Sequence, residues 1–299
     1  MNVTITGASG TIGRRLIKAV GAANHSVGVL ARNVRADMPA GVRLWEWDAM
    51  KGPPPPESLA DADAVIHLAG EPVAQRWTNA AKERIRDSRV LGTRHLVEGL
   101  AALPRRPAVL ISSSAVGYYG SRGDEVLTEH APPGTGFLAE VCKAWEAEAD
   151  RACEFGIRVA KIRTGVVLAK NGGALPKMLP LFRAYLGGTV GSGSQWMSWI
   201  HIEDLTALML LALVHPLAGA VNGTAPHPAT NAEFTRVLAA TLGRPAMLPV
   251  PAFAVRLLMG EMTEVLLASQ RVLPEAARRA GFTFRYPELD HALKNLLRA

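Results

Sequence analysis

The stretch "TITGASGTIGRRL" (residues 4–16) decides the fold, because it spaces three glycines three residues apart behind a short β-branched run. Gly7 allows a tight turn, Gly10 lets backbone N–H groups approach a pyrophosphate, and Gly13 lets the following helix pack close to the strand. The N-terminus of that helix adds partial positive charge where a diphosphate would sit. The stretch predicts a strand, a dinucleotide-binding turn and a helix, although a purely structural tight turn would also satisfy it.

Strand and helix signals alternate through the first half of the chain. Further apolar runs that predict strands lie at 26–32, 42–48, 63–70, 108–116 and 157–168. Near-continuous apolar strands that alternate with helices indicate a parallel sheet covered on both faces. The predicted fold class is therefore α/β, a Rossmann-type doubly wound parallel sheet.

The chain becomes rich in glycine and proline after residue 169. Residues 1–169, with returning segments near 197–225, are predicted to form the NADP-binding Rossmann domain. Residues 170–196 and 226–299 are predicted to form a smaller C-terminal substrate domain that closes over the sheet.

Composition narrows the class of protein. The 299 residues are 48% hydrophobic and 20% charged, which is typical of a soluble globular protein. The net charge is +7, but basic residues never form a run longer than a pair, which favours an anionic small molecule over nucleic acid. No signal peptide or long apolar run is present, so a cytoplasmic protein without a membrane partner is expected. The two cysteines have no C-x-x-C spacing, and no metal site is predicted.

The end of the second expected strand, "VLARN" (29–33), indicates which dinucleotide binds. An NAD site usually has Asp or Glu there for the ribose hydroxyls, whereas Arg32 would pair with a 2′-phosphate. NADP(H) is therefore the predicted cofactor, with a solvated strand-end arginine as the alternative. Asp48, which ends the third expected strand, is either an acceptor for the adenine amino group or a turn residue.

The chain resembles the extended short-chain dehydrogenase/reductases, and more closely an atypical branch labelled nucleoside-diphosphate-sugar epimerases. The blocks that carry the resemblance are "GASGTIG", "LAGEPVAQRW", "SRVLGT", "SAVGYYG", "RTGVVL", "GSGSQWMSWIHIEDL", "NGTAPHPATNAEF" and "SQRVLP". The resemblance implies an NADP(H)-dependent oxidoreductase or epimerase that acts on a nucleotide sugar or a related carbonyl or alcohol. It implies a cofactor site at Ser9, Gly10, Thr11, Ile12, Arg32, Leu68, Ala69, Gly70, Arg84, Arg89 and Val167, although Arg84 also fits an exposed charged helix face.

One departure from the wider superfamily bears on catalysis. Active members use a Tyr as proton donor or acceptor, and a Lys four residues later lowers its pKa and holds the nicotinamide ribose. Aligning Glu146 with the glutamate that usually follows the lysine places Leu138 and Cys142 at these two positions. Lys143 is one residue away, which turns it about 100° around the helix. The usual dyad is therefore absent.

Three interpretations of the missing dyad stay open. Ser114 stands where a serine orients the substrate oxygen, and Tyr118 or Tyr119 could replace the acid. Glu71 or His201 could serve instead, or the protein could bind NADP(H) without turnover, as a sensor or scaffold. The predicted substrate pocket between sheet and second domain contains Glu71, Gln195, Trp199, His201 and Arg271.

Overall fold

The computed structural model describes residues 1–33, 38–39, 41–246 and 249–298. Across these residues, seven parallel strands form the central sheet in the order β11-β7-β5-β4-β1-β2-β3. The strands are β1 (Asn2–Thr6), β2 (Ser26–Ala31), β3 (Arg43–Glu46), β4 (Ala64–His67), β5 (Val109–Ala115), β7 (Arg158–Thr164) and β11 (Gly219–Gly223). This order confirms the predicted Rossmann-type sheet, with its switch point between β1 and β4.

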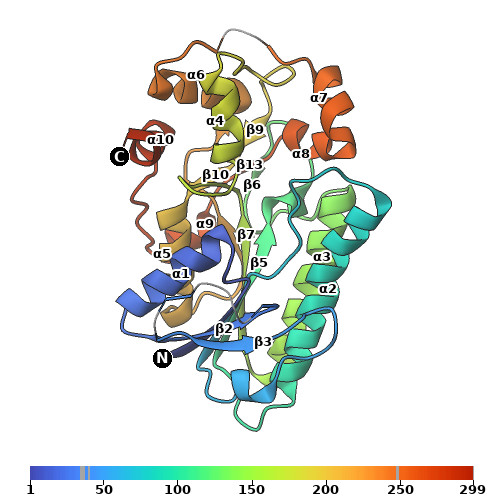
Figure 1. Ribbon diagram of the computed structural model, residues 1–299, viewed down its shortest axis with the longest axis vertical. Coiled ribbons are helices and arrows are strands. Elements are labelled where there is room, and N and C mark those ends of the chain that lie inside the picture. The colour runs from blue at the N-terminus through green and yellow to red at the C-terminus, as the bar shows by residue number, and fades with distance from the viewer. Residues whose placement is uncertain (34–37, 40, 247–248, 299) are drawn as a thin grey trace.

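Helices cover both faces of the sheet (Figure 1). Side chains alternate along a strand, so Val109 and Ile111 of β5 pack beneath α1 and α5, whereas Leu110 packs beneath α2 and α3. Both faces of β5 are therefore buried, which explains its continuous apolar sequence. The covering helices are α1 (Thr11–Ala22), α5 (Ile202–Val214), α2 (Asn79–Ala101) and α3 (Phe137–Asp150).

A second apolar cluster lies beyond the carboxyl ends of the strands, where α4, α6 and α10 come together (Figure 1). Trp199, Phe234 and Leu293 are fully buried in it. The chain after residue 226 does not stay in this cluster, because Ala277 packs into the main core under α5. The helices of this part are α4 (Leu175–Arg183), α6 (Asn231–Leu242), α7 (Ala252–Met259), α8 (Thr263–Leu267), α9 (Glu275–Arg279) and α10 (Leu289–Arg298). The predicted domain boundaries stay a prediction.

Pairs of short strands lie outside the central sheet: Val166–Leu168 and Trp199–His201 contribute to both clusters, whereas Leu127 and Val272 belong to a separate small cluster with Val116 and Tyr119. Arg271–Val272 pairs in parallel with Val126–Leu127, and Trp199–His201 pairs with Val166–Leu168. The minor strands are β6 (Val126–Leu127), β8 (Val166–Leu168), β9 (Trp196–Met197), β10 (Trp199–His201), β12 (Ala229–Thr230) and β13 (Arg271–Val272). In the described part of the chain, no helix is both long and apolar enough to span a membrane.

Candidate cofactor site

The three glycines of the first turn have different surroundings. Gly7 has φ +68°, and a Cβ there would lie 2.7 Å from the carbonyl carbon of Leu68. A Cβ on Gly13 would lie 2.5 Å from Cα of Ala8, so close packing of strand and helix requires glycine there. At Gly10 the single neighbour within 4 Å of such a Cβ, among described residues, is the Gly7 oxygen at 3.3 Å. Gly10 therefore borders open space above the turn, where a ligand fits.

The N-terminus of α1 faces this space. Gly10 caps the helix, and in the described structure no side chain caps it and no acid occupies its first turn. Ser9 and Gly10 are exposed, and Arg14 Nε braces the turn by donating to the Ser9 carbonyl oxygen at 3.0 Å. The first N–H groups of α1, with their partial positive charge, are therefore available to an anion.

A buried hydrogen-bond chain supports the ends of β1 and β4. Thr6 Oγ1 accepts from the backbone N–H groups of Leu68 and Ala69, each at 3.2 Å, so its own proton is donated to His67 Nδ1 at 2.7 Å. His67 Nε2 then donates to Thr93 Oγ1 at 3.1 Å. Burial lowers the pKa of His67 to about 4. Neutral His67 thus holds the backbone of Leu68 and Ala69 at the edge of the crevice between β1 and β4, where this fold binds dinucleotides.

Arg32 and Asp48 differ in their freedom to bind a ligand. Arg32 is exposed directly after β2 and has no ion-pair partner among the described residues. Asp48 Oδ1 accepts from the backbone N–H of Met50 at 3.1 Å, and Oδ2 lies 3.7 Å from Lys51 Nζ. The structure therefore shows Asp48 in a turn, its role at the adenine stays a prediction, and Arg32 is available for a phosphate.

Arg89 packs flat beneath Gly70. A Cβ on Gly70 would lie 3.2 Å from Arg89 Cζ, and the guanidinium is 5.2 Å from the ring centroid of Trp145. Arg89 Nη1 donates to the carbonyl oxygens of Glu71 and Ile85 at 3.0 Å each. Burial lowers the pKa of Arg89. The arginine thereby fixes the loop that follows β4.

The other predicted cofactor residues lie at the rim. Arg84 is exposed, and its Nε is 3.6 Å from Glu71 Oε1. Val167 of β8 pairs with Ile200 and is half-buried against the main core. Arg84 therefore forms a surface ion pair, and Val167 serves as an apolar wall.

The structure revises the role predicted for Ser114. Its side chain is 3% exposed, and Oγ donates to Glu146 Oε1 at 2.6 Å. Glu146 is gripped by Arg163, with Nε to Oε1 and Nη2 to Oε2 both at 2.8 Å, and Lys161 Nζ is 3.8 Å from Oε2. Glu146 is therefore an ionised acceptor, and the Ser114 proton is committed to it. Only the Ser114 lone pairs are left for a substrate.

The two tyrosines after Ser114 have different environments. Tyr119 is fully buried, donates to Asn222 Oδ1 at 2.7 Å and accepts from Arg163 Nη1 at 2.9 Å. Burial raises its pKa to about 12. The prediction of Tyr119 as a proton donor was wrong, because its hydroxyl has two protein partners in the core. Tyr118 is half-buried, with its ring centroid 3.5 Å from Arg163 Cζ, and keeps some exposed surface.

The positions of the missing dyad are apolar. Leu138 belongs to a cluster with Trp77 and Met262. A Cβ on Gly117 would lie 3.2 Å from Leu138 Cβ and 3.9 Å from Cys142 Sγ, so α3 packs on the turn that follows β5. Burial, and next Glu146, raises the pKa of Cys142 to about 11. Neither side chain can supply the proton transfer or the cationic charge of the usual pair.

His201 is a structural residue. It caps α5, with Nδ1 accepting from the backbone N–H of Glu203 at 3.1 Å and Nε2 lying 3.2 Å from Asn295 Oδ1. Its ring stacks on Tyr286 at a centroid distance of 3.9 Å, and the residue is 1% exposed. Burial lowers the pKa of His201 to about 4. The prediction that His201 lines a substrate pocket was wrong, because this contact between α5 and α10 encloses it.

The other predicted pocket residues separate into interior and rim. Trp199 is 0% exposed and donates Nε1 to the His227 carbonyl oxygen at 3.0 Å, and Gln195 is 6% exposed with its amide on backbone carbonyls. These two predictions were also wrong, because both side chains belong to the interior. Arg271 is half-buried, its Cζ 4.5 Å from the Trp196 ring centroid, and Glu71 is half-buried at the loop after β4.

The buried pair Glu146–Arg163 was missed in the sequence, although a signal was present. Each charge interrupts an apolar pattern, "AWEAEA" (144–149) in a helix and "VAKIRTG" (159–165) in a strand. A charge at a core position is rarely buried without a partner, which could have suggested the pair. Gln270 makes another, half-buried polar contact between distant segments, since its Nε2 donates to the carbonyl oxygens of Val116 and Gly120 at 3.0 Å each.

Both buried histidines should make the fold sensitive to acid. Their folded pKa, about 4, lies below the ordinary 6.5, so the unfolded chain binds more protons between these values. Stability from His67 and His201 is complete above pH 6.5 and falls toward pH 4, by about 1.4 kcal/mol per pH unit for each. Urea unfolding from pH 7 to 4.5 should show a shallower decline for His67→Gln and His201→Gln than for the parent. An unchanged slope in both variants would contradict this account.

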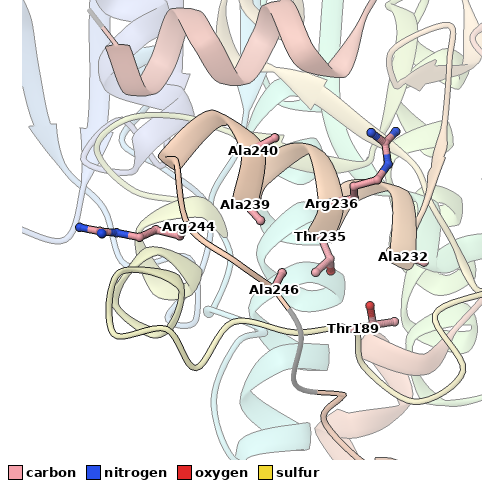
Figure 2. A pocket seen from close by; sticks show the side chains of 8 residues that line it. All are labelled: Thr189, Ala232, Thr235, Arg236, Ala239, Ala240, Arg244 and Ala246. Atoms are coloured by element: carbon pink, nitrogen blue, oxygen red, sulfur yellow. The ribbon is translucent and has the colours of Figure 1, made fainter.

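A separate hollow of about 330 Å³ lies over α6 (Figure 2). Figure 1 shows that α6 lies away from the central sheet. In Figure 2, the long side chains of Arg236 and Arg244 extend in different directions from it. Its lining residues are Thr189, Ala232, Thr235, Arg236, Ala239, Ala240, Arg244 and Ala246. None of the predicted site residues belongs to this lining, so it is distinct from the crevice at the switch point.

Comparison with known proteins agrees with this geometry. Residues 3–225 match the NAD dependent epimerase/dehydratase family, and residues 250–296 match a domain of unknown function, DUF1731. The chain is 42% identical to the chloroplastic epimerase family protein SDR39U1 homolog of Arabidopsis thaliana, covering 99% of this chain and 87% of that protein. The crystal structure of human SDR39U1 (isoform 2) with NADPH superimposes with TM-score 0.88 at 33% identity, covering 100% and 99% of the two chains. A nucleoside-diphosphate sugar epimerase of Corynebacterium glutamicum gives TM-score 0.81 at 39% identity, covering 99% of this chain and 58% of that one.

Proposed function

Because this chain belongs to the NAD-dependent epimerase/dehydratase family, we propose that it is an NADP(H)-dependent oxidoreductase or epimerase. The observation that carries the proposal is the N-terminus of α1 behind Gly10, which no side chain of the described residues caps, together with Arg32 at the end of the next strand, which has no ion-pair partner among those residues. The human relative solved with NADPH supports the same cofactor. The proposed substrate is a carbonyl or alcohol compound, such as a nucleotide sugar.

The residues present fit this cofactor. The first N–H groups of α1 would hold the diphosphate, Arg32 the 2′-phosphate, and the loop from Leu68 to Gly70 the nicotinamide ribose. When bound, the nicotinamide supplies or accepts the hydride. Arg89 and the Thr6–His67 chain keep that loop in place from beneath.

Proton transfer has to proceed without the usual dyad. The Ser114 hydroxyl donates its hydrogen bond to Glu146, so toward a substrate hydroxyl Ser114 can act only as a hydrogen-bond acceptor. Tyr118 keeps exposed surface and contacts Arg163, which also binds the Glu146 partner of Ser114, and we therefore assign Tyr118 the role of proton donor. Arg163 positions both groups, through Glu146 on one side and the Tyr118 ring on the other.

A second candidate function is NADP(H) binding without turnover, as a sensor or scaffold. The apolar Leu138 and the buried, protonated Cys142 favour it, because neither can replace the dyad. A screen of nucleotide sugars, aldehydes and ketones that follows NADPH absorbance separates the two functions. Turnover that is lost in Tyr118→Phe supports the enzyme, whereas tight NADPH binding without turnover across the screen supports the sensor.

Arg32→Glu is expected to weaken NADPH binding by about 10- to 150-fold, the effect of one charge-assisted hydrogen bond worth about 1.5–3 kcal/mol. NADH lacks the 2′-phosphate, so its affinity should change little. Fluorescence titration with NADPH and with NADH gives the ratio of the two affinities directly. Arg105→Glu, which alters an exposed arginine paired with Asp63, serves as the matched control. If Arg32→Glu leaves the NADPH/NADH affinity ratio unchanged, the 2′-phosphate assignment is wrong.

A further inference from the structure

The segment from Gly172 to Lys177, named the strap, touches the phosphate-binding turn at its first residue. A Cβ on Gly172 would lie 2.0 Å from Thr11 Oγ1 and 3.1 Å from Thr11 Cβ, so the two residues are in van der Waals contact. Gly172 has φ +104°, which favours glycine. Thr11 is the first residue of α1, so this end of the strap lies over the N-terminus that would hold the diphosphate.

The other end of the strap reaches the opposite side of the crevice. Lys177 Nζ donates to the carbonyl oxygen of Ala74 at 3.2 Å, and Ala74 belongs to the loop that follows β4. The chain leaves β1 and β4, which are adjacent in the sheet, toward opposite faces, and the crevice between them is where this fold binds dinucleotides. A strap that contacts Thr11 and Ala74 therefore crosses that crevice.

The strap brings an uncompensated positive charge to the crevice. Lys177 is exposed, and in the described part of the chain it has no acidic partner within ion-pair distance. The N-terminus of α1, with no acid in its first turn, faces the crevice from below. Two sources of positive charge on either side of one crevice favour an anion between them. The Gly172 contact and the Lys177 charge are independent observations from the two ends of the strap, one on each side of the crevice.

We propose that the strap is the second wall of the cofactor site, with Lys177 as a ligand of the cofactor diphosphate; this rests on the proposed function. The strap keeps its place, because Leu175 inside it is fully buried in the second apolar cluster, so nucleotide entry requires only that the contacts at Thr11 and Ala74 open. Its role differs from that of Arg32, because the diphosphate is common to NADPH and NADH. Lys177 therefore contributes to affinity and not to the choice between the two nucleotides.

The test compares Lys177→Gln and Gly172→Ala with two matched controls. Lys143→Gln removes an exposed lysine of α3, and Gly156→Ala places a Cβ at φ +78° in open space. Each strap variant should raise the dissociation constants of NADPH and NADH by the same factor, and for Lys177→Gln this factor should be about 10- to 150-fold, the effect of one charge-assisted hydrogen bond. Both controls should bind as the parent does.

Hydrogen exchange of the parent protein gives a readout that is independent of affinity. Added NADPH should slow amide exchange across residues 168–177, and Gly172→Ala should reduce this protection. If the parent binds no NADPH, the proposed function and the strap assignment both fail. If the parent binds and both strap variants bind equally well, the strap assignment alone fails. A changed NADPH/NADH ratio in Lys177→Gln would overturn the diphosphate assignment and place the lysine at the 2′-phosphate.

Discussion

Glu146→Ala is expected to destabilise the fold by about 3–5 kcal/mol, the usual cost of removing one partner of a buried ion pair. Arg163 is 4% exposed and would lose both of its bonds to the carboxylate. Ser114 would lose the acceptor of its hydroxyl proton at the same time. A chain of ordinary stability, about 5–15 kcal/mol, would thereby lose a large share of its folding free energy.

Urea unfolding at pH 7 measures this effect. Glu140→Ala is the control on the same helix. Glu140 is exposed, with its Oε2 4.0 Å from Lys143 Nζ, and the loss of this surface ion pair should cost less than about 1 kcal/mol. The double variant Glu146→Leu/Arg163→Met should regain most of the lost stability, because it leaves no unpaired buried charge. If the free energy of unfolding of Glu146→Ala lies within about 1 kcal/mol of that of the parent, water already solvates the Arg163 guanidinium and the ion pair is not needed for stability.

Gly10→Ala is expected to weaken NADPH binding by about 10- to 150-fold while the fold keeps its stability. Gly10 has φ −73°, which alanine adopts freely, and the nearest atom to the new Cβ would be the Gly7 oxygen at 3.3 Å. The methyl group would instead occupy the space of the diphosphate and separate it from the N–H groups of α1. Losing one such charge-assisted hydrogen bond costs about 1.5–3 kcal/mol.

Thermal unfolding and NADPH fluorescence titration separate the two effects. Gly13→Ala is the contrast, because its Cβ would lie 2.5 Å from Cα of Ala8 and should reduce stability together with binding. If the Gly10→Ala protein binds NADPH as tightly as the parent does, the diphosphate does not bind at this turn. A Gly10→Ala protein that unfolds several degrees lower would show that the turn itself requires glycine there.

The first turn and its helix were predictable because their signals are local. The spacing of Gly7, Gly10 and Gly13 specifies a turn between adjacent elements, and the structure shows the close approaches that Gly7 and Gly13 require. The exposure of Arg32 was predictable for the same reason, because it follows from the position of the residue directly after a strand. The alternation of strand and helix signals also made the parallel sheet predictable, because parallel strands need crossover connections, which are most often helices.

The chemistry beside that turn depended on contacts between distant segments. Ser114 meets Glu146 across 32 residues, Tyr119 meets Asn222 across 103, and His201 meets Asn295 across 94. No sequence window contains such a pair, so a hydroxyl or imidazole near a motif gives no indication of whether core packing encloses it. The sequence by itself determined the dinucleotide turn and the absence of the Tyr/Lys dyad. Only the tertiary structure decided which polar side chains face the crevice, because burial and partner choice arise when α3, β7 and the C-terminal segment pack together.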